Sequence, residues 1–169
     1  MPITRGVWRA FLAASATLLC AALVAGTALA VTSPDQTREG YVAAVEPICE
    51  TNTKANERIL AGVRKQVKQG KLDLAAARFF KAADAFGQAT EQIRAVPQPP
   101  ADATRLAKWL SRLDDEETLL RKIGKDLKAG RKSRAQADSV RLTHNGNLAN
   151  NAVLGFEFNY CLIKQSRFS

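Results

Sequence analysis

Three clusters of helix-breaking residues divide the chain after residue 37 into four amphipathic segments, and this division constrains the fold most. The breaks are Gly70, the run Pro97-Gln98-Pro99-Pro100, and Gly130. Between the breaks, apolar residues recur every three or four positions, which is the spacing of one helix face. Helices joined by short connections pack as antiparallel neighbours, so the sequence predicts an all-α, up-down-up-down four-helix bundle.

The second and third helices have the clearest patterns. The second repeats its apolar positions through three heptads after Leu72. The third extends to Leu127, and Asp102 or Thr104 can cap its start. Both therefore define elements of the predicted bundle.

The first and fourth segments contain residues that favour an interruption. Pro47 either kinks one long helix over residues 37–70 or lies in the first turn of a helix that begins near Glu46. The fourth segment runs from Ser133 to about Leu154 and contains the turn signal Asn145-Gly146. A break at that turn signal is therefore an alternative to a continuous fourth helix.

Beyond Gly155 the apolar period changes to two, which favours an extended strap on the bundle over a frayed helix. Cys49 and Cys161 are the two cysteines of the chain outside its first thirty residues. In an exported protein such a pair predicts a disulfide. The alternative is a two-thiolate metal site, for which His144 would be the only other strong ligand. The predicted topology favours the disulfide, because helix four ends beside the start of helix one and the strap can span the remaining distance.

The first thirty residues have the three-part pattern of a secretory signal. Arg5 and Arg9 are followed by an uncharged run to Gly26 and by the small-x-small site Ala28-Leu29-Ala30. We expect cleavage after Ala30, which leaves residues 31–169 as an extracytoplasmic or secreted bundle domain. The alternative is an uncleaved N-terminal membrane anchor, since the apolar run is close to the shortest length that spans a bilayer.

The chain has a formal net charge of +9, and its cations gather at the predicted turns around Gly70 and Gly130. Such a surface favours an anionic partner, for example phospholipid headgroups or an envelope polymer. Nucleic acid is not expected, because no aromatic residue interleaves the lysines. The alternative is that the cations only stabilise helix C-termini and keep the protein soluble. We call this surface the basic pole: Lys65, Lys68, Lys71, Lys122, Lys125, Lys128, Arg131, Lys132 and Arg134.

An acidic run over residues 114–117 lies in the middle of the third helix. Glu116 or Glu117 falls where the apolar stripe of that helix expects a core residue, opposite polar residues of the fourth helix. A buried carboxylate needs hydrogen-bond partners, so we predict a buried polar network that fixes the helix register. Its candidate members are Glu117, His144, Asn147 and Asn151.

Composition excludes several functional classes. One histidine cannot supply a multi-His metal site, and the chain contains no P-loop, GxGxxG, CxxC, HExxH or GxSxG motif. Glu117 and His144 could act as a general acid and base, but no nucleophile accompanies them. We therefore expect no catalytic residue, no metal and no cofactor.

The two ends of the predicted domain resemble those of a group of small, uncharacterised exported actinobacterial proteins. The resemblance is carried by Pro47-Ile48-Cys49 and by the tail from Ala149 to Gly155-Phe156-Glu157-Phe158-Asn159-Tyr160-Cys161. It implies an extracytoplasmic helical bundle closed by a disulfide, and it supplies no activity or catalytic residue. Such proteins are often lipoproteins, but here Leu18 and Leu19 precede Cys20 and no lipobox is present.

These observations predict an exported, non-enzymatic binding or envelope-associated module. Its basic pole would contact an anionic envelope component or another exported protein. A first alternative is a binder of a small apolar ligand, with a cavity beside Phe79, Phe86 and Trp109 where Ala75, Ala76, Ala82 and Ala83 leave space. A second alternative is an enzyme that uses Glu117 and His144 in an open cleft.

Overall fold

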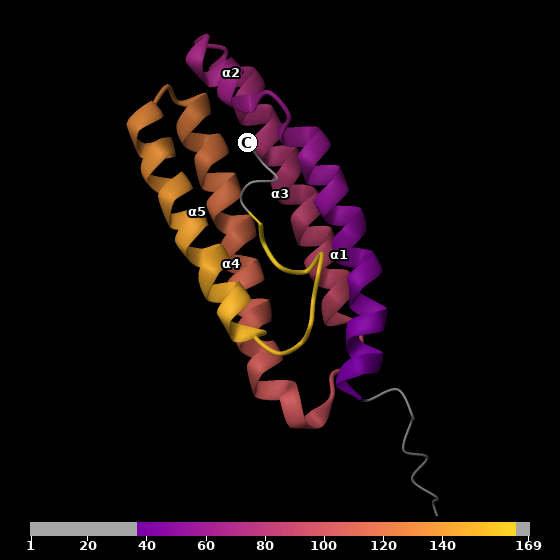
Figure 1. Cartoon of the computed structure of the whole chain (residues 1–169). Coiled ribbons are helices and arrows are strands. Elements are labelled where there is room, and N and C mark those ends of the chain that lie inside the picture. The colour runs from indigo at the N-terminus through magenta and orange to yellow at the C-terminus, as the bar shows by residue number, and fades with distance from the viewer. Residues whose placement is uncertain (1–36, 165–169) are drawn as a thin grey trace, which may run out of the picture. The chain divides into compact units, whose positions relative to one another are not determined.

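Helix α1 (Arg38–Leu60) begins at Thr37, whose hydroxyl oxygen accepts a hydrogen bond from the Gly40 backbone N–H at 3.0 Å. The computed structural model describes residues 37–164 (Figure 1). Pro47 lies inside α1, so no separate helix begins near Glu46. The predicted signal segment and its cleavage site after Ala30 lie outside the described residues.

The first predicted helix is interrupted at Ala61-Gly62, a position that the apolar periodicity did not indicate. Gly62 has φ +75°, the left-handed conformation that glycine adopts without strain, and a short helix α2 (Val63–Lys68) follows. The guanidinium of Arg78 donates hydrogen bonds to the carbonyl oxygens of Ile59 at 3.0 Å and Ala61 at 2.6 Å. These bonds satisfy carbonyl groups that the end of α1 leaves without helical partners.

The remaining helices follow the predicted segments closely. Helix α3 (Leu72–Arg94) ends before the proline run, a 3₁₀ turn η1 (Pro100–Asp102) follows, and α4 (Ala103–Lys128) ends before Gly130. Asp102 precedes α4 but makes no side-chain cap. Its carboxylate instead accepts hydrogen bonds from Arg38 at 2.7 and 2.8 Å, which ties the beginning of α4 to the beginning of α1.

Helix α5 (Lys132–Ala152) is continuous through Asn145-Gly146, so the turn signal does not break it. Both residues are buried in the bundle. A Cβ atom at Gly146 would lie 3.0 Å from Cγ2 of Ile163, so the missing side chain lets the strap approach α5. Tertiary packing therefore uses the glycine where the local sequence favours a turn.

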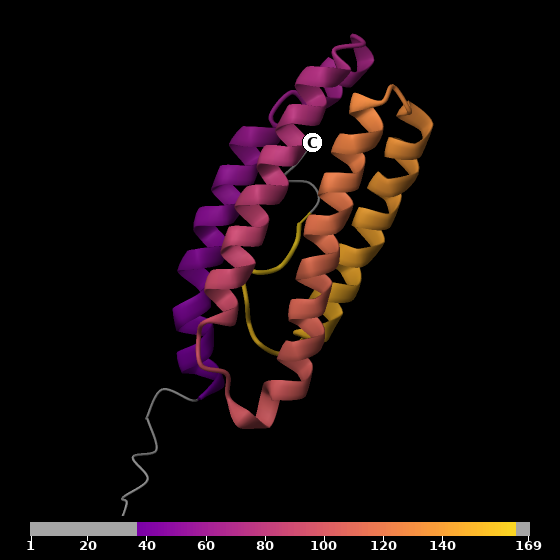
Figure 2. The same cartoon turned by 180° about the vertical axis from the view of Figure 1, so that it is seen from behind.

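The four long helices of the described region form the predicted up-down-up-down bundle, with a gap on one side. Helix α1 packs on α3, α3 on α4, and α4 on α5, whereas α1 and α5 stand apart (Figures 1 and 2). The strap, residues 155–164, runs between α1 and α5 and has no regular secondary structure. None of the described helices is long and apolar enough to cross a membrane.

The composition of α5 explains why the bundle is open on that side. The buried residues of α5 are Ala135, Asp138, Asn145, Gly146 and Ala149, which are small or polar. Small residues allow α5 to lie close to α4, but they provide no large apolar stripe that could pack against α1. Near the beginning of α1, the strap fills the gap between the helices with the buried side chains of Phe156 and Phe158.

The predicted disulfide is present and fixes the strap to α1. Cys49 and Cys161 are bonded, with their Cα atoms 5.0 Å apart. Glu46, one helical turn earlier, accepts hydrogen bonds from the backbone N–H groups of Asn159, Tyr160 and Cys161 at 3.0 to 3.1 Å. A carboxylate that receives several N–H donors is a strong anchor.

Removal of this carboxylate is expected to destabilise the protein even when the disulfide is intact. Glu46→Ala leaves three strap N–H groups without their acceptor, and we expect the free energy of unfolding to fall by about 2 kcal/mol. Urea denaturation of the oxidised protein measures this change. The exposed Glu91→Ala is the matched control and should shift stability by no more than about 0.5 kcal/mol. Equal values for the two variants would contradict the anchoring role of Glu46.

Candidate functional site

A groove lies along the side of the bundle where α1 and α5 stand apart. It has a volume of about 650 Å³, and small-molecule sites typically measure about 300–1,000 Å³. Helices α1 and α2 line one side, α5 lines the other, and α3 and α4 lie between them, while the strap contributes residues 160–164. Apolar side chains from these elements line it: Leu60, Val67, Phe79, Phe86, Leu120, Leu127, Leu142 and Leu162.

The groove is elongated. Along α4 its lining extends from Trp109 to Leu127, a distance of roughly 27 Å at about 1.5 Å per residue. The disulfide lies in its lining as well, because Cys49 and Cys161 both contribute to it. The covalent bond that fixes the strap therefore also sets one boundary of the groove.

The three aromatic residues that the sequence associated with a cavity, Phe79, Phe86 and Trp109, all line the groove. The predicted origin of the space is wrong, however. The four alanines of α3 named for it are buried in helix packing and do not line the groove: Ala75, Ala76, Ala82 and Ala83. The space arises because α1 and α5 do not meet.

Two polar atoms of the groove lining have no hydrogen-bond partner among the described residues. Asn56 is 3% exposed, and its Nδ2 donates to Oδ1 of Asn52 at 2.9 Å, which leaves its own Oδ1 unpartnered. The indole Nε1 of Trp109 is also unpartnered, although the residue is 0% exposed. Such orphan atoms are rare in folded proteins. Both atoms lie beneath the surface of the groove and are inaccessible to solvent.

Glu116 is the single carboxylate that the described part of the chain contributes to the groove lining. It is buried, and its Oε2 accepts a hydrogen bond from Nδ2 of Asn145 at 2.8 Å. The same Asn145 amide donates to the carbonyl oxygen of Arg112, also at 2.8 Å. Burial raises the pKa of Glu116 to about 7, and the nearby Asp115 acts in the same direction, whereas the Asn145 hydrogen bond opposes the shift.

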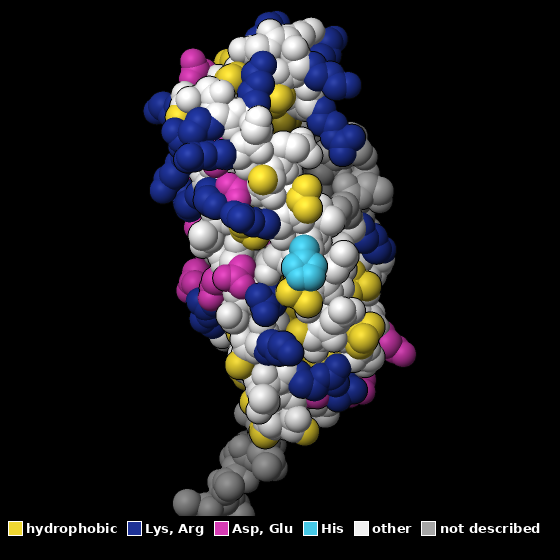
Figure 3. Space-filling model, turned by 90° about the vertical axis from the view of Figure 1, so that its left-hand side faces the viewer, with side chains coloured by type: hydrophobic (Ala, Val, Ile, Leu, Met, Phe, Trp, Pro, Cys, Tyr) yellow, Lys and Arg dark blue, Asp and Glu magenta, His cyan; other side chains and the backbone are white. Residues whose placement is uncertain are grey.

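The predicted polar network is wrong in its membership, because α5 buries Asn145 where His144 was expected, and α4 buries Glu116, the other of the two positions offered by its apolar stripe. His144, Asn147 and Asn151 are exposed on α5, and the histidine is visible at the surface in Figure 3. The buried pair is Glu116 with Asn145. Glu117 is half-buried and lies over Gly87 of α3, where Arg121 donates to its Oε1 at 2.9 Å. Glu117 and His144 therefore do not form an acid–base pair in a common cleft.

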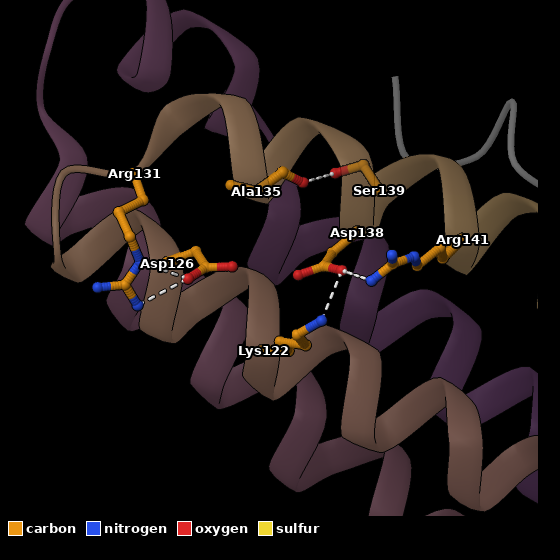
Figure 4. Close-up of polar contacts among 7 residues, drawn as sticks. All are labelled: Lys122, Asp126, Arg131, Ala135, Asp138, Ser139 and Arg141. Atoms are coloured by element: carbon orange, nitrogen blue, oxygen red, sulfur yellow. Dashed lines mark hydrogen bonds and ion pairs between the residues drawn. The ribbon is translucent and has the colours of Figure 1, made fainter.

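All residues of the basic pole are exposed, and they gather at the end of the bundle that carries α2 and the α4–α5 turn (Figures 1 and 3). Some of their charge is neutralised locally. Arg131 pairs with Asp126 at 2.7 Å, and Lys122 pairs with Asp138 at 2.9 Å (Figure 4). Both acids are buried beneath the cations.

Asp138, which the sequence analysis did not single out, is the second buried acid beneath the basic pole. The Asp138 carboxylate also accepts a hydrogen bond from the Arg141 guanidinium at 2.9 Å (Figure 4). Burial disfavours the charged form, but the Lys122 hydrogen bond and the charges of Lys122 and Arg141 outweigh it and hold the pKa below the usual range. Asp138 lies three positions after Ala135 and seven before Asn145, which places it on the buried face of α5. The cations opposite it therefore have a structural role as well.

A second group of cations lies at the rim of the groove. Arg64 and Lys68 of α2, Lys132 of α5 and Lys164 of the strap all contribute to its lining. Within the described region none of the first three forms an ion pair, and each is exposed. The basic pole and the groove are thus continuous at the α2 end. We call Arg64, Lys68 and Lys132 the mouth cations.

Together the fold and the groove define an open, disulfide-closed helical bundle with an apolar site and a cationic mouth. Among residues 37–164, no three His, Cys, Asp or Glu side chains come together as a metal site would require. No protein-family model matches the chain, and no curated protein or solved structure is significantly similar to it. The resemblance to exported actinobacterial proteins stays a prediction.

Proposed function

We propose that the protein is a non-enzymatic binding module whose groove holds an elongated, largely apolar small molecule. The observation that carries this proposal is the groove itself, whose lining is mostly apolar, with polar side chains chiefly on the α1 and α5 walls. A stable helical bundle has no physical need for such a groove, since burial of its apolar lining against α5 would add stability. An open apolar site that persists in the fold favours a ligand as its occupant.

The polar atoms of the lining support the same function. Polar side chains also line the groove, among them Thr53 of α1 and Gln136 and Thr143 of α5. A few polar groups in a largely apolar pocket fix the orientation of a bound ligand, and this requires no catalytic reaction. Glu117 and His144, the candidate general acid and base, do not lie together: His144 is exposed on α5, whereas Glu117 lies against Gly87 of α3. A binding role therefore fits the side chains better than catalysis.

Two features support an extracytoplasmic place for this module. Disulfides persist in oxidising compartments, and the Cys49–Cys161 bond joins the two ends of the described fold. The first thirty residues carry the signal pattern and the Ala-x-Ala site. We therefore place ligand binding outside the cytoplasm, in the envelope or the medium.

Binding of a neutral apolar probe tests the proposal. Diphenylhexatriene becomes fluorescent when it enters an apolar site, and we expect saturable binding to the oxidised protein. Ser139 is half-buried in the groove lining, so Ser139→Trp inserts a large ring into the site. We expect this variant to weaken probe binding at least about tenfold, a change of about 1.4 kcal/mol.

The matched control is Ser111→Trp, which adds the same ring at an exposed position of α4 outside the groove. It should bind the probe like the unmodified protein. Circular dichroism establishes that both variants keep their helices. Absence of saturable binding to the unmodified protein, or equal binding by the two variants, would overturn the proposed function.

A further inference from the structure

We propose that the groove binds a single-chain anionic amphiphile, with its acyl chain along α4 and its anionic head at the mouth cations. This inference rests on the proposed function and specifies the ligand class of the same site. The mouth cations Arg64, Lys68 and Lys132 line the groove at the end where α2 faces the start of α5 (Figures 1 and 2). They belong to two elements on opposite sides of the opening, so the positive charge is contributed from both sides.

The distribution of charge in the lining favours an anion. Among residues 37–164, four cations line the groove and Glu116 is the single acid. The mouth cations form no ion pair with any described residue, in contrast to Lys122 and Arg131 of the basic pole, which pair with buried acids. Unpaired cations at an apolar opening attract a ligand that is negative at one end. The opposite polarity, a cationic amphiphile, would meet repulsion there.

The same distribution determines which way the ligand lies. Glu116 precedes Leu127, at the mouth end of α4, by eleven positions, which corresponds to roughly 16 Å along the helix. An anionic head placed at the strap end would lie near the Glu116 carboxyl, whereas a head at the mouth avoids it. One acyl chain measures about 15 Å, half of a bilayer hydrocarbon core of about 30 Å. A chain that starts at the mouth therefore reaches the level of Glu116 and Asn145.

A comparison of amphiphiles with one chain length tests this inference. Hexadecanoate, hexadecanol and hexadecyltrimethylammonium are allowed to displace diphenylhexatriene at about pH 8, each as a monomer. We expect hexadecanoate to bind about tenfold more tightly than hexadecanol, and the trimethylammonium compound to bind most weakly. The preference for hexadecanoate should shrink as the ionic strength rises from about 0.05 M to about 0.5 M, because salt screens exposed charges.

The matched variants separate the mouth cations from the overall charge. The triple variant Arg64→Gln, Lys68→Gln and Lys132→Gln should lose the tenfold preference and keep its affinity for hexadecanol. The control triple variant Lys65→Gln, Lys71→Gln and Lys125→Gln removes the same charge from residues outside the groove lining and should keep the preference. Equal effects of the two triple variants would overturn the inference.

The outcomes distinguish the two proposals. Binding of hexadecanol and hexadecanoate with equal affinity supports the groove as a ligand site and refutes the anionic head. Failure of every amphiphile to displace a bound probe refutes the amphiphile as the ligand, whereas absence of saturable probe binding refutes the proposed function itself. Binding to anionic vesicles without binding of monomeric hexadecanoate would show that the mouth cations contact a lipid surface, and this result also refutes the inference.

Discussion

Replacement of Cys49 and Cys161 by serine is expected to lower the free energy of unfolding by about 5 kcal/mol. The bridge joins residues 112 positions apart, and in the chain-entropy model a loop of about that length contributes about 5 kcal/mol through the unfolded state. Small domains have total stabilities of about 5–15 kcal/mol. The double variant should therefore be marginally stable, with a much lower urea midpoint.

The same change is expected to weaken ligand binding, because both cysteines line the groove. Without the covalent bond the strap keeps the Glu46 anchor and the hydrogen bonds of Asn150 with Ile163 at 2.9 and 3.1 Å, but these can open locally. Urea denaturation and probe titration measure the two effects. The unmodified protein in excess reductant is the control and should behave like the double variant. A loss of stability below about 1 kcal/mol would contradict this expectation.

Glu116→Gln is expected to stabilise the protein at alkaline pH by about 3 kcal/mol. The pKa of Glu116 is raised from 4.5 to about 7 in the folded state, so the folded protein binds a proton that the unfolded chain releases between these values. Stability is therefore complete at low pH and is lost as the pH rises through about 7. Each pKa unit corresponds to about 1.4 kcal/mol. Glutamine stays neutral and keeps an oxygen that accepts the Asn145 hydrogen bond.

Urea denaturation of both proteins between about pH 4 and about pH 8 measures this difference. The two stability curves should meet at the acidic end and separate as the pH rises. The pKa values of Asp102 and Asp138 are lowered in the folded state, so protonation of these carboxylates in acid destabilises both proteins. Because this effect is the same in both proteins, it cancels in the difference between their free energies of unfolding. Glu117→Gln is the matched control, because it changes the neighbouring, half-buried carboxylate that pairs with Arg121. This variant should not become more stable than the unmodified protein as the pH rises. A difference that does not depend on pH would exclude burial of the charged form as its cause.

The boundaries of α3 and α4 could be predicted because glycine, proline and apolar periodicity act locally. Gly70 and Gly130 follow helix ends in the left-handed conformation, with φ of +75° and +73°, and the proline run cannot continue a helix. The disulfide could be predicted from the cysteine count and the bundle topology together. The Ala61-Gly62 break could not, because the apolar positions before and after it continue the same periodicity.

The buried polar pair was misassigned for a different reason. In a run of four acids, the helical period does not decide between Glu116 and Glu117, since neighbouring positions differ by only about 100° around the axis. Helix α5 offered little help, because its buried residues are small or polar. Only the packing of α5 against α4 selects Asn145 over His144 as the inward residue.

The sequence alone determined the order of the helices, their antiparallel packing and the Cys49–Cys161 disulfide. These properties depend on local periodicity, on helix-breaking residues and on the pairing of two cysteines. The groove, the orphan atoms of Asn56 and Trp109, and the contact of the mouth cations with the groove were decided only by the tertiary structure. They exist because α5 has too little apolar surface to meet α1, and that separation is a property of two helices distant in sequence.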